Sequence, residues 1–123
     1  MAKVMIIDDS DAIRMVLKDI LMIGQHNLVS ELPSGIGALE EYIKSNPDIV
    51  LLDMAMPKKD GLAVLKEIME YNPKAKVVMI SASDNQETVK DCIGAGASAY
   101  ILKPFNFQDV LSIINQVAKS QVG

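Results

Sequence analysis

Acidic and other reactive side chains directly follow short apolar segments of the chain: Asp8, Asp9, Asp53, Ser81 and Lys103. If these segments are neighbouring strands of one parallel sheet, their carboxyl ends lie at one edge and the three carboxylates converge there. Carboxylates that close cannot all remain ionised unless a cation lies among them. Mg²⁺ is the best match, because it prefers oxygen ligands and commonly combines carboxylates with phosphate oxygens. The pattern therefore predicts a Mg²⁺ site.

A carboxylate beside such a cation can also attack phosphorus, with the cation and a lysine neutralising the charge of the transferred group. Asp53 is the predicted nucleophile, because it stands alone after the central apolar segment 49–52. Asp8 and Asp9 are adjacent in sequence and are better placed to hold the metal. Taken singly, an acid such as Asp9 or Asp11 could instead cap the first helix. Their joint occurrence at successive segment ends favours chemistry.

Short apolar segments alternate with segments of helical periodicity along the chain. The predicted strands cover residues 3–7, 27–32, 48–52, 76–80 and 98–102. The predicted helices are the segment between a Ser10 cap and Gly24, about 35–44, 61–71, one that starts near Asp84 with Glu87 as a capping-box partner, and 107–119 with Asn106 as its cap. This alternation implies right-handed crossovers and a parallel sheet covered by helices on both faces.

The predicted fold is therefore a doubly wound α/β fold with a five-stranded parallel sheet and five helices. Polar residues in the segments 27–32 and 98–102 place these two strands at the edges, whereas the other three are almost uniformly apolar. The order 2-1-3-4-5 of flavodoxin-like sheets satisfies this pattern. Ligands of such sheets bind at the carboxyl edge, where the winding direction reverses between strands 1 and 3.

Length and composition exclude several classes of function. The 123 residues, half of them apolar, suit one domain over residues 1–123. A net charge of −4 with scattered Lys and Arg argues against nucleic-acid binding. The apolar segments are too short to span a membrane, and without an export signal we expect a cytoplasmic protein. His26 is the only histidine and Cys92 the only cysteine, which excludes a zinc site, a Ser-His-Asp triad and an internal disulfide.

Four motifs occur in a characteristic order along the chain. They are Ile7-Asp8-Asp9-Ser10, the segment 51–61 with Asp53, Met56-Pro57 and Asp60-Gly61, Ile80-Ser81-Ala82, and the segment 96–105 with Lys103-Pro104. Together they resemble the receiver domain of two-component signalling, specifically the stand-alone chemotaxis response regulators of the CheY type. The resemblance extends from the first strand to the last helix. It implies that a sensor histidine kinase transfers a phosphoryl group from a phosphohistidine to Asp53.

The resemblance also implies how the cation would be held. Asp9, Asp53 and the backbone carbonyl of Ala55 would contact Mg²⁺ directly. Asp8 would assist through a water molecule.

Further residues are implied for the phosphorylated form. The Ser81 hydroxyl would bind one phosphoryl oxygen, and Lys103, joined to Pro104 by a cis peptide, would form an ion pair with another. Tyr100 would be the aromatic switch, its ring turning inward as Ser81 moves toward the phosphoryl group. This change would remodel the face formed by the fourth helix, the fifth strand and the fifth helix, which would bind a motor-switch or adaptor protein.

The implied protein is a signalling switch in chemotaxis or motility control and not an enzyme, since it would catalyse only its own phosphorylation and slow dephosphorylation. Its partners would be a chemotaxis kinase and the downstream protein. We expect a monomer, because the helical segments show no excess apolar face. A phosphorelay intermediate, which passes its phosphoryl group to another histidine protein, uses the same chemistry and stays an alternative.

Two alternatives come from other classes of protein. Asp9-Ser10-Asp11 also resembles the first motif of Mg²⁺ phosphatases of the haloacid-dehalogenase type, in which Asp9 would be the nucleophile. That interpretation leaves Asp53 and Lys103-Pro104 unexplained. A flavin carrier of the same topology would need hydroxyls and glycines to hold a phosphate, whereas the first loop here is anionic.

Overall fold

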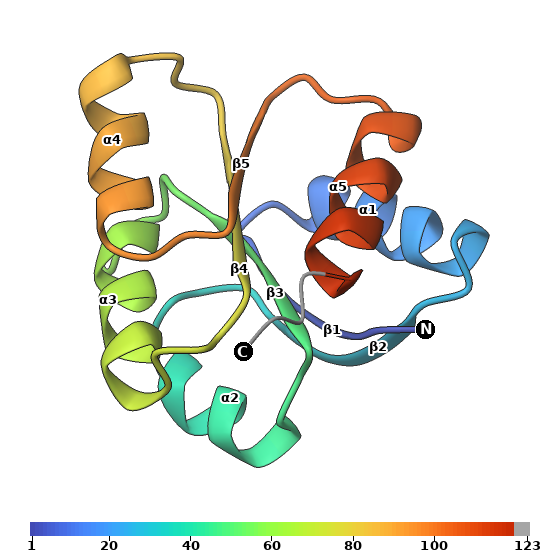
Figure 1. Cartoon of the computed structure of the whole chain (residues 1–123), viewed down its shortest axis with the longest axis horizontal. Helices are drawn as coiled ribbons and strands as arrows, with labels where there is room; N and C mark the ends of the chain where they lie inside the picture. Colours follow the sequence, from blue (N-terminus) through green and yellow to red (C-terminus); the bar gives the residue numbers. More distant parts are fainter. Residues whose placement is uncertain (120–123) are drawn as a thin grey trace.

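In the computed structural model, residues 1–119 are described, and within them strands and helices alternate (Figure 1). The strands are β1 (Lys3–Ile7), β2 (Asn27–Leu32), β3 (Ile49–Asp53), β4 (Val77–Ser81) and β5 (Ala99–Leu102). The helices are α1 (Asp11–Ile23), α2 (Ala38–Ser45), α3 (Gly61–Tyr71), α4 (Gln86–Gly94) and α5 (Phe107–Lys119). Ser10 and Asn106 accept hydrogen bonds from the first turns of α1 and α5, which confirms both predicted caps.

The five strands form one parallel sheet in the order β2-β1-β3-β4-β5, as predicted. All residues of β3 and β4 are buried, whereas β2 contains no fully buried residue and belongs at an edge. Because every strand runs in the same direction, all carboxyl ends lie at one edge of the sheet. The reactive residues of the sequence follow or end these strands and are therefore brought to that edge.

Helices cover both faces of the sheet, with α1 and α5 on one side and α2, α3 and α4 on the other (Figure 1). Side chains alternate between the faces along each strand, so neighbouring residues of β1 contribute to different cores. Met5 and Ile7 pack with α2, α3 and α4, whereas Val4 and Ile6 pack with α1 and α5. Within residues 1–119, no helix has the length and apolarity needed to cross a membrane.

Several element boundaries differ from the predicted ones. The structure begins α2 at Ala38 and not near residue 35, because Gly37 has a left-handed backbone with φ of 77°. It begins α4 at Gln86, capped by Asn85, and not near Asp84. Both β3 and β4 begin and end one residue later than expected. As a result, Asp53 and Ser81 are the last residues of their strands and share the rigidity of the sheet.

The expectation that no helix has an excess apolar face is wrong for α1. Its core side is formed by Leu17, Ile20 and Leu21. On its outer side four large apolar residues are exposed: Met15 (63%), Val16 (46%), Met22 (75%) and Ile23 (61%). Periodicity identified the core side correctly but did not show that these further apolar positions remain uncovered. The monomeric state accordingly stays a prediction without that support.

Candidate functional site

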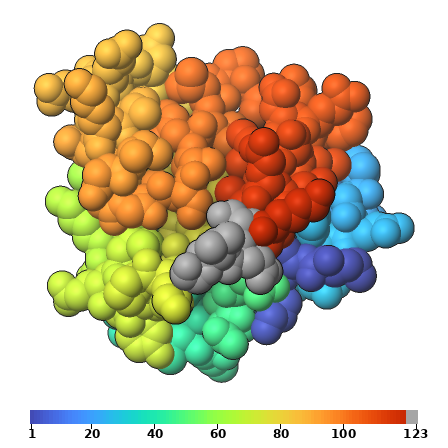
Figure 2. Space-filling model, in the orientation of Figure 1, coloured from blue at the N-terminus to red at the C-terminus, as the bar shows by residue number. Residues whose placement is uncertain are grey.

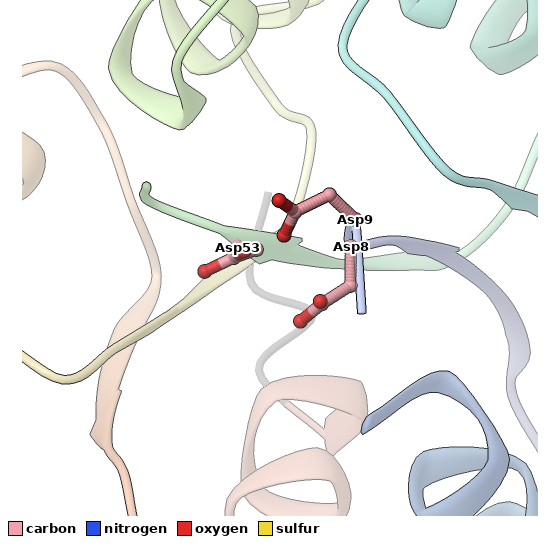
Figure 3. A group of neighbouring side chains, drawn as sticks. All are labelled: Asp8, Asp9 and Asp53. Carbon is pink, nitrogen blue, oxygen red and sulfur yellow. The ribbon is translucent and has the colours of Figure 1, made fainter. Parts of the chain in front are cut away.

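Three carboxylates converge at the carboxyl edge of the sheet. Asp8 and Asp9 directly follow β1, and Asp53 ends β3, the strand hydrogen-bonded next to β1. One oxygen from each carboxylate lies within 4.8 Å of the others. Figure 3 shows the Asp9 side chain reaching from beside Asp8 toward Asp53. The convergence predicted from the sequence is therefore confirmed for these three acids.

Two of these acids are removed from solvent. Asp8 is 1% exposed and Asp53 is 3% exposed, whereas Asp9 is open to solvent. Burial, and after it the negative charge of Asp8, raises the pKa of Asp53 to about 6, while the Lys103 ammonium opposes the shift. Asp53 is therefore a carboxylate whose charge is costly in the metal-free protein and is stabilised by any added cation.

Lys103 supplies one positive charge to this group of acids. Its Nζ lies 3.2 Å from Oδ1 of Asp53 and 3.7 Å from Oδ2 of Asp8. The residue directly follows β5, and its backbone N–H donates to the carbonyl of Ser81 at 2.7 Å. The peptide between Lys103 and Pro104 is cis, as the resemblance implied. The lysine thus reaches the acids across β4, from two strands away from Asp53.

The donor set fits a hard divalent cation. Oδ2 of Asp8 is buried and has no hydrogen-bond partner in the described part of the chain, although buried carboxylate oxygens normally have one. Its second oxygen, Oδ1, accepts from the N–H of Ser10 at 2.8 Å. A buried carboxylate oxygen without a hydrogen bond, beside two further carboxylates, is the arrangement that a cation with oxygen ligands would complete. The cluster can therefore hold a metal ion.

Ser81 and Tyr100 are connected through the loop between β4 and α4. Ser81 is buried, and its hydroxyl oxygen accepts from the N–H of Ser83 at 3.0 Å. The hydroxyl of Tyr100 donates to the carbonyl of the same Ser83 at 2.8 Å. Ser81 and Tyr100 thus both bind the backbone of Ser83, through its N–H and its carbonyl respectively.

The remaining residues singled out in the sequence are Ala55, Cys92 and His26, and only Ala55 follows a strand at this edge. Ala55 is exposed in the loop after β3, two residues beyond Asp53. Cys92 is buried in α4, with its Sγ 3.8 Å from Sδ of Met54, in keeping with a hydrophobic packing role. His26 precedes β2, where its ring bonds to the N–H of Ala2 and to Oδ1 of Asn115, both at 3.1 Å. Because Ala2 precedes β1 and the acids follow it, His26 lies at the opposite end of the strands from the acids.

Sequence reasoning missed Arg14, which contacts the acidic loop. Its guanidinium donates to the backbone carbonyl of Asp8 at 2.5 Å. The available signal was a cation in the first helix, one turn after Ser10, but its partner Glu31 comes from β2 and could not be recognised by spacing alone.

Comparison with known proteins connects this site to a family. Residues 4–115 match the response regulator receiver domain. The chain is 40% identical over 114 residues to the chemotaxis protein CheY of Bacillus subtilis, covering 93% of this chain and 95% of that protein. It is 39% identical over 117 residues to CheY of Thermotoga maritima, covering 95% and 98%. Among solved structures, a chain of the CheX-CheY-BeF3-Mg²⁺ complex of Borrelia burgdorferi has a TM-score of 0.90 at 38% identity, covering 94% of this chain and 87% of that one.

Proposed function

Because this chain belongs to the response regulator receiver domain family and is homologous to the CheY chemotaxis regulators, we propose that it is a phosphorylation-activated switch whose acceptor is Asp53. The observation that supports this acceptor is the buried Asp53 carboxylate, with Lys103 at 3.2 Å and two further acids around it. Asp53 is the one member of the cluster that ends a central strand, which holds it in a fixed place.

In the proposed reaction an oxygen of the Asp53 carboxylate attacks the phosphorus of a phosphohistidine on a sensor kinase. The P–O bond forms as the P–N bond breaks, and the leaving imidazole takes up a proton from solvent. With its pKa raised to about 6, Asp53 is mostly ionised at pH 7 and is ready as a nucleophile. Lys103 would exchange its bond to Asp53 for an ion pair with the phosphoryl group.

We assign the cation site to Asp8, Asp9, Asp53 and the backbone carbonyl of Ala55, with Mg²⁺ as the ion. The buried Oδ2 of Asp8, which lacks a hydrogen bond, and the three converging carboxylates support this assignment. Mg²⁺ in such a site neutralises part of the charge that develops during phosphoryl transfer. Asp8, whose other oxygen accepts a hydrogen bond from the N–H of Ser10, would help to hold the ion from the buried side.

The output of the switch would be a changed surface on α4, β5 and α5. In Figure 2 these elements form a continuous part of the visible surface. Leu102 and Phe107 expose apolar side chains there, 45% and 48% respectively. The link from Ser81 through Ser83 to Tyr100 ends on β5, so movement of the hydroxyl toward a phosphoryl group would alter this face. A motor-switch or adaptor protein of the chemotaxis apparatus is the partner we propose for it.

On this account the protein is not a hydrolase acting on other molecules. In the phosphatase alternative Asp9 would be the nucleophile and Asp11 its partner in the motif, but Asp11 is exposed and paired with Arg14. Asp53 and Lys103, which the phosphatase alternative does not use, are members of the cluster. A phosphorelay role would use the same acceptor and differs only in the downstream partner.

The switch can be tested with beryllofluoride, the group present with Mg²⁺ in the Borrelia burgdorferi CheX-CheY complex. Backbone amide NMR spectra of the full chain would be compared with and without beryllofluoride and Mg²⁺. We expect chemical-shift changes at the acids and also along α4, β5 and α5. Asp53→Asn serves as the control and should show neither. Changes confined to the acids in the wild type would contradict a switch.

A further inference from the structure

Arg14 connects three segments of the chain near the acids. It lies in the first half of α1, and its side chain is only 12% exposed. Its Nη1 donates to the backbone carbonyl of Asp8 at 2.5 Å, and its Nε donates to Oε2 of Glu31 at 3.0 Å. Its Nη2 donates to Oδ1 of Asp11. Each nitrogen of the guanidinium therefore has its own acceptor, which fixes the plane of the group.

The carbonyl that Arg14 binds belongs to the peptide between Asp8 and Asp9. A peptide unit is planar, so the direction of its carbonyl also fixes where the following Cα lies. Two other polar groups of Asp8 have partners of their own: its N–H donates to the carbonyl of Leu32, and its Oδ1 accepts from the N–H of Ser10. Arg14 thus fixes the one backbone group of Asp8 that determines how Asp9 leaves the sheet edge.

Arg14 is itself held in place from β2. Glu31 accepts from Arg14 through one oxygen and from Lys18 through the other, at 2.9 Å. The Lys18 ammonium, assisted by Arg14, keeps the pKa of Glu31 below its usual value, so Glu31 stays anionic. Lys18 and Arg14 therefore share one acid, but only Arg14 reaches the backbone of Asp8.

We propose that Arg14 is a positioning residue for the cation site: by holding the Asp8–Asp9 peptide it keeps the Asp9 carboxylate where it can share a divalent cation with Asp8 and Asp53. This inference rests on the proposed metal site. The three carboxylates repel one another at separations within 4.8 Å, and Asp9 is the only one of the three that is exposed to solvent. Without a fixed peptide, Asp9 would turn toward solvent and the ion would lose a preorganised ligand.

The test is Mg²⁺ affinity, measured by titration calorimetry on the full chain. Arg14→Met removes the donor to Asp8 and keeps an apolar stem, whereas Lys18→Met removes a cation and a partner of Glu31 without touching Asp8. We expect Arg14→Met to weaken Mg²⁺ binding about tenfold, as loss of an outer partner of a metal ligand typically does. Lys18→Met should stay within about twofold of the wild type. Equal weakening in both variants would show a general charge effect and overturn the proposal.

Arg14→Lys covers the case in which Arg14→Met does not fold. It keeps the positive charge but cannot present three separate donors, so Mg²⁺ binding should still weaken. Unchanged affinity in folded Arg14→Met or Arg14→Lys, with thermal unfolding as the check on folding, would overturn the positioning role. The calorimetry does not depend on phosphorylation. A wild type that binds Mg²⁺ but is not phosphorylated on Asp53 would refute the proposed function and leave the Arg14 result intact, whereas a wild type that binds no Mg²⁺ would refute this inference as well.

Discussion

The Nζ atom of Lys103 lies 3.2 Å from Oδ1 of Asp53, joining the end of β5 to the end of β3 across the intervening strand β4. The same ammonium is 3.7 Å from Asp8, so one lysine is shared between two buried carboxylates. Burial, and after it the negative charge of Asp8, raises the pKa of Asp53 to about 6, and the single positive charge of Lys103 does not offset this. The site is therefore electrostatically unfavourable until a cation binds.

We predict that Asp53→Asn stabilises the metal-free protein at pH 7. The pKa of Asp53 is about 6 in the folded chain and lower in the unfolded chain, so the folded form binds the proton more tightly. The contribution of Asp53 to the free energy of unfolding is complete below pH 4 and is lost as pH rises through 6. At pH 7 the free energy of unfolding of the variant should be about 1–3 kcal/mol higher than that of the wild type.

Thermal or urea unfolding in EDTA at pH 4 and pH 7 checks this prediction. Near pH 4 Asp53 is mostly protonated when folded, so the advantage of the variant should shrink toward zero. An equal gain at both pH values would show that the effect is unrelated to the charge of Asp53. A loss of stability at pH 7 would contradict the electrostatic account.

We predict that Lys103→Met accepts the phosphoryl analogue but does not transmit the change. Beryllofluoride and Mg²⁺ should still shift the amide signals near Asp53, because the cation supplies most of the neutralising charge. Signals of α4, β5 and α5 should stay near their free positions, because the ion pair from β5 is missing. Lys44→Met, an exposed lysine on α2, is the control. If the amide signals of α4, β5 and α5 shifted in Lys103→Met as they do in the wild type, Lys103 would have no role in coupling the acceptor to this face.

Mg²⁺ should raise the melting temperature of the wild type. An ion that binds only the folded form adds about 1.4 kcal/mol to the free energy of unfolding when its free concentration is about ten times its Kd. In Asp9→Asn this gain should fall sharply, since one of the three acids of the cluster is neutral. Asp19→Asn, which changes an exposed acid on α1, should keep the full gain. If Asp19→Asn lost as much as Asp9→Asn, Mg²⁺ would be acting on overall charge.

Gly61→Ala should perturb the acceptor strand. A Cβ at this position would overlap the carbonyl oxygen of Asp53 and lie 2.8 Å from Cα of Met54. These neighbours are backbone atoms and cannot move without shifting Asp53, so we expect a loss of about 1–3 kcal/mol in unfolding free energy. At Gly94 a Cβ would meet nothing within 4 Å, and Gly94→Ala should be neutral or stabilising by about 0.5–1 kcal/mol. Urea unfolding of the two variants would reveal whether they differ in this way.

The sheet order and the acid cluster were predictable because they depend on local patterns. An apolar strand such as β1 stops at Asp8, and parallel neighbours then bring Asp53 to the same edge. The last paired residues of β3 and β4 were not predictable in this way. Asp53 and Ser81 are polar, so the apolar pattern ends before them, yet the backbone pairing Asp53↔Ile80 and Ser81↔Leu102 continues.

Features that depend on contacts between distant segments could not be predicted. In the sequence, Arg14 has the position of an ordinary surface residue of an amphipathic helix. Its contact with the Asp8 carbonyl is supported by Glu31, which lies 17 residues further along the chain. The start of α2 depends on the left-handed backbone of Gly37, a conformation that the neighbouring Gly35 could equally have adopted.

The most direct test of the central claim is the mass and position of a phosphoryl group after incubation of the full chain with acetyl phosphate. The experiment compares the wild type with Asp53→Asn and Asp9→Asn, each incubated with Mg²⁺ or with EDTA. Mass spectrometry of the intact protein gives the number of phosphoryl groups, and reduction of the acyl phosphate with borohydride locates the modified residue. We predict one added phosphoryl group in the wild type, dependent on Mg²⁺ and located on Asp53, and none in Asp53→Asn. A phosphoryl group on Asp9, or one that persists in Asp53→Asn, would contradict the account and favour the phosphatase alternative.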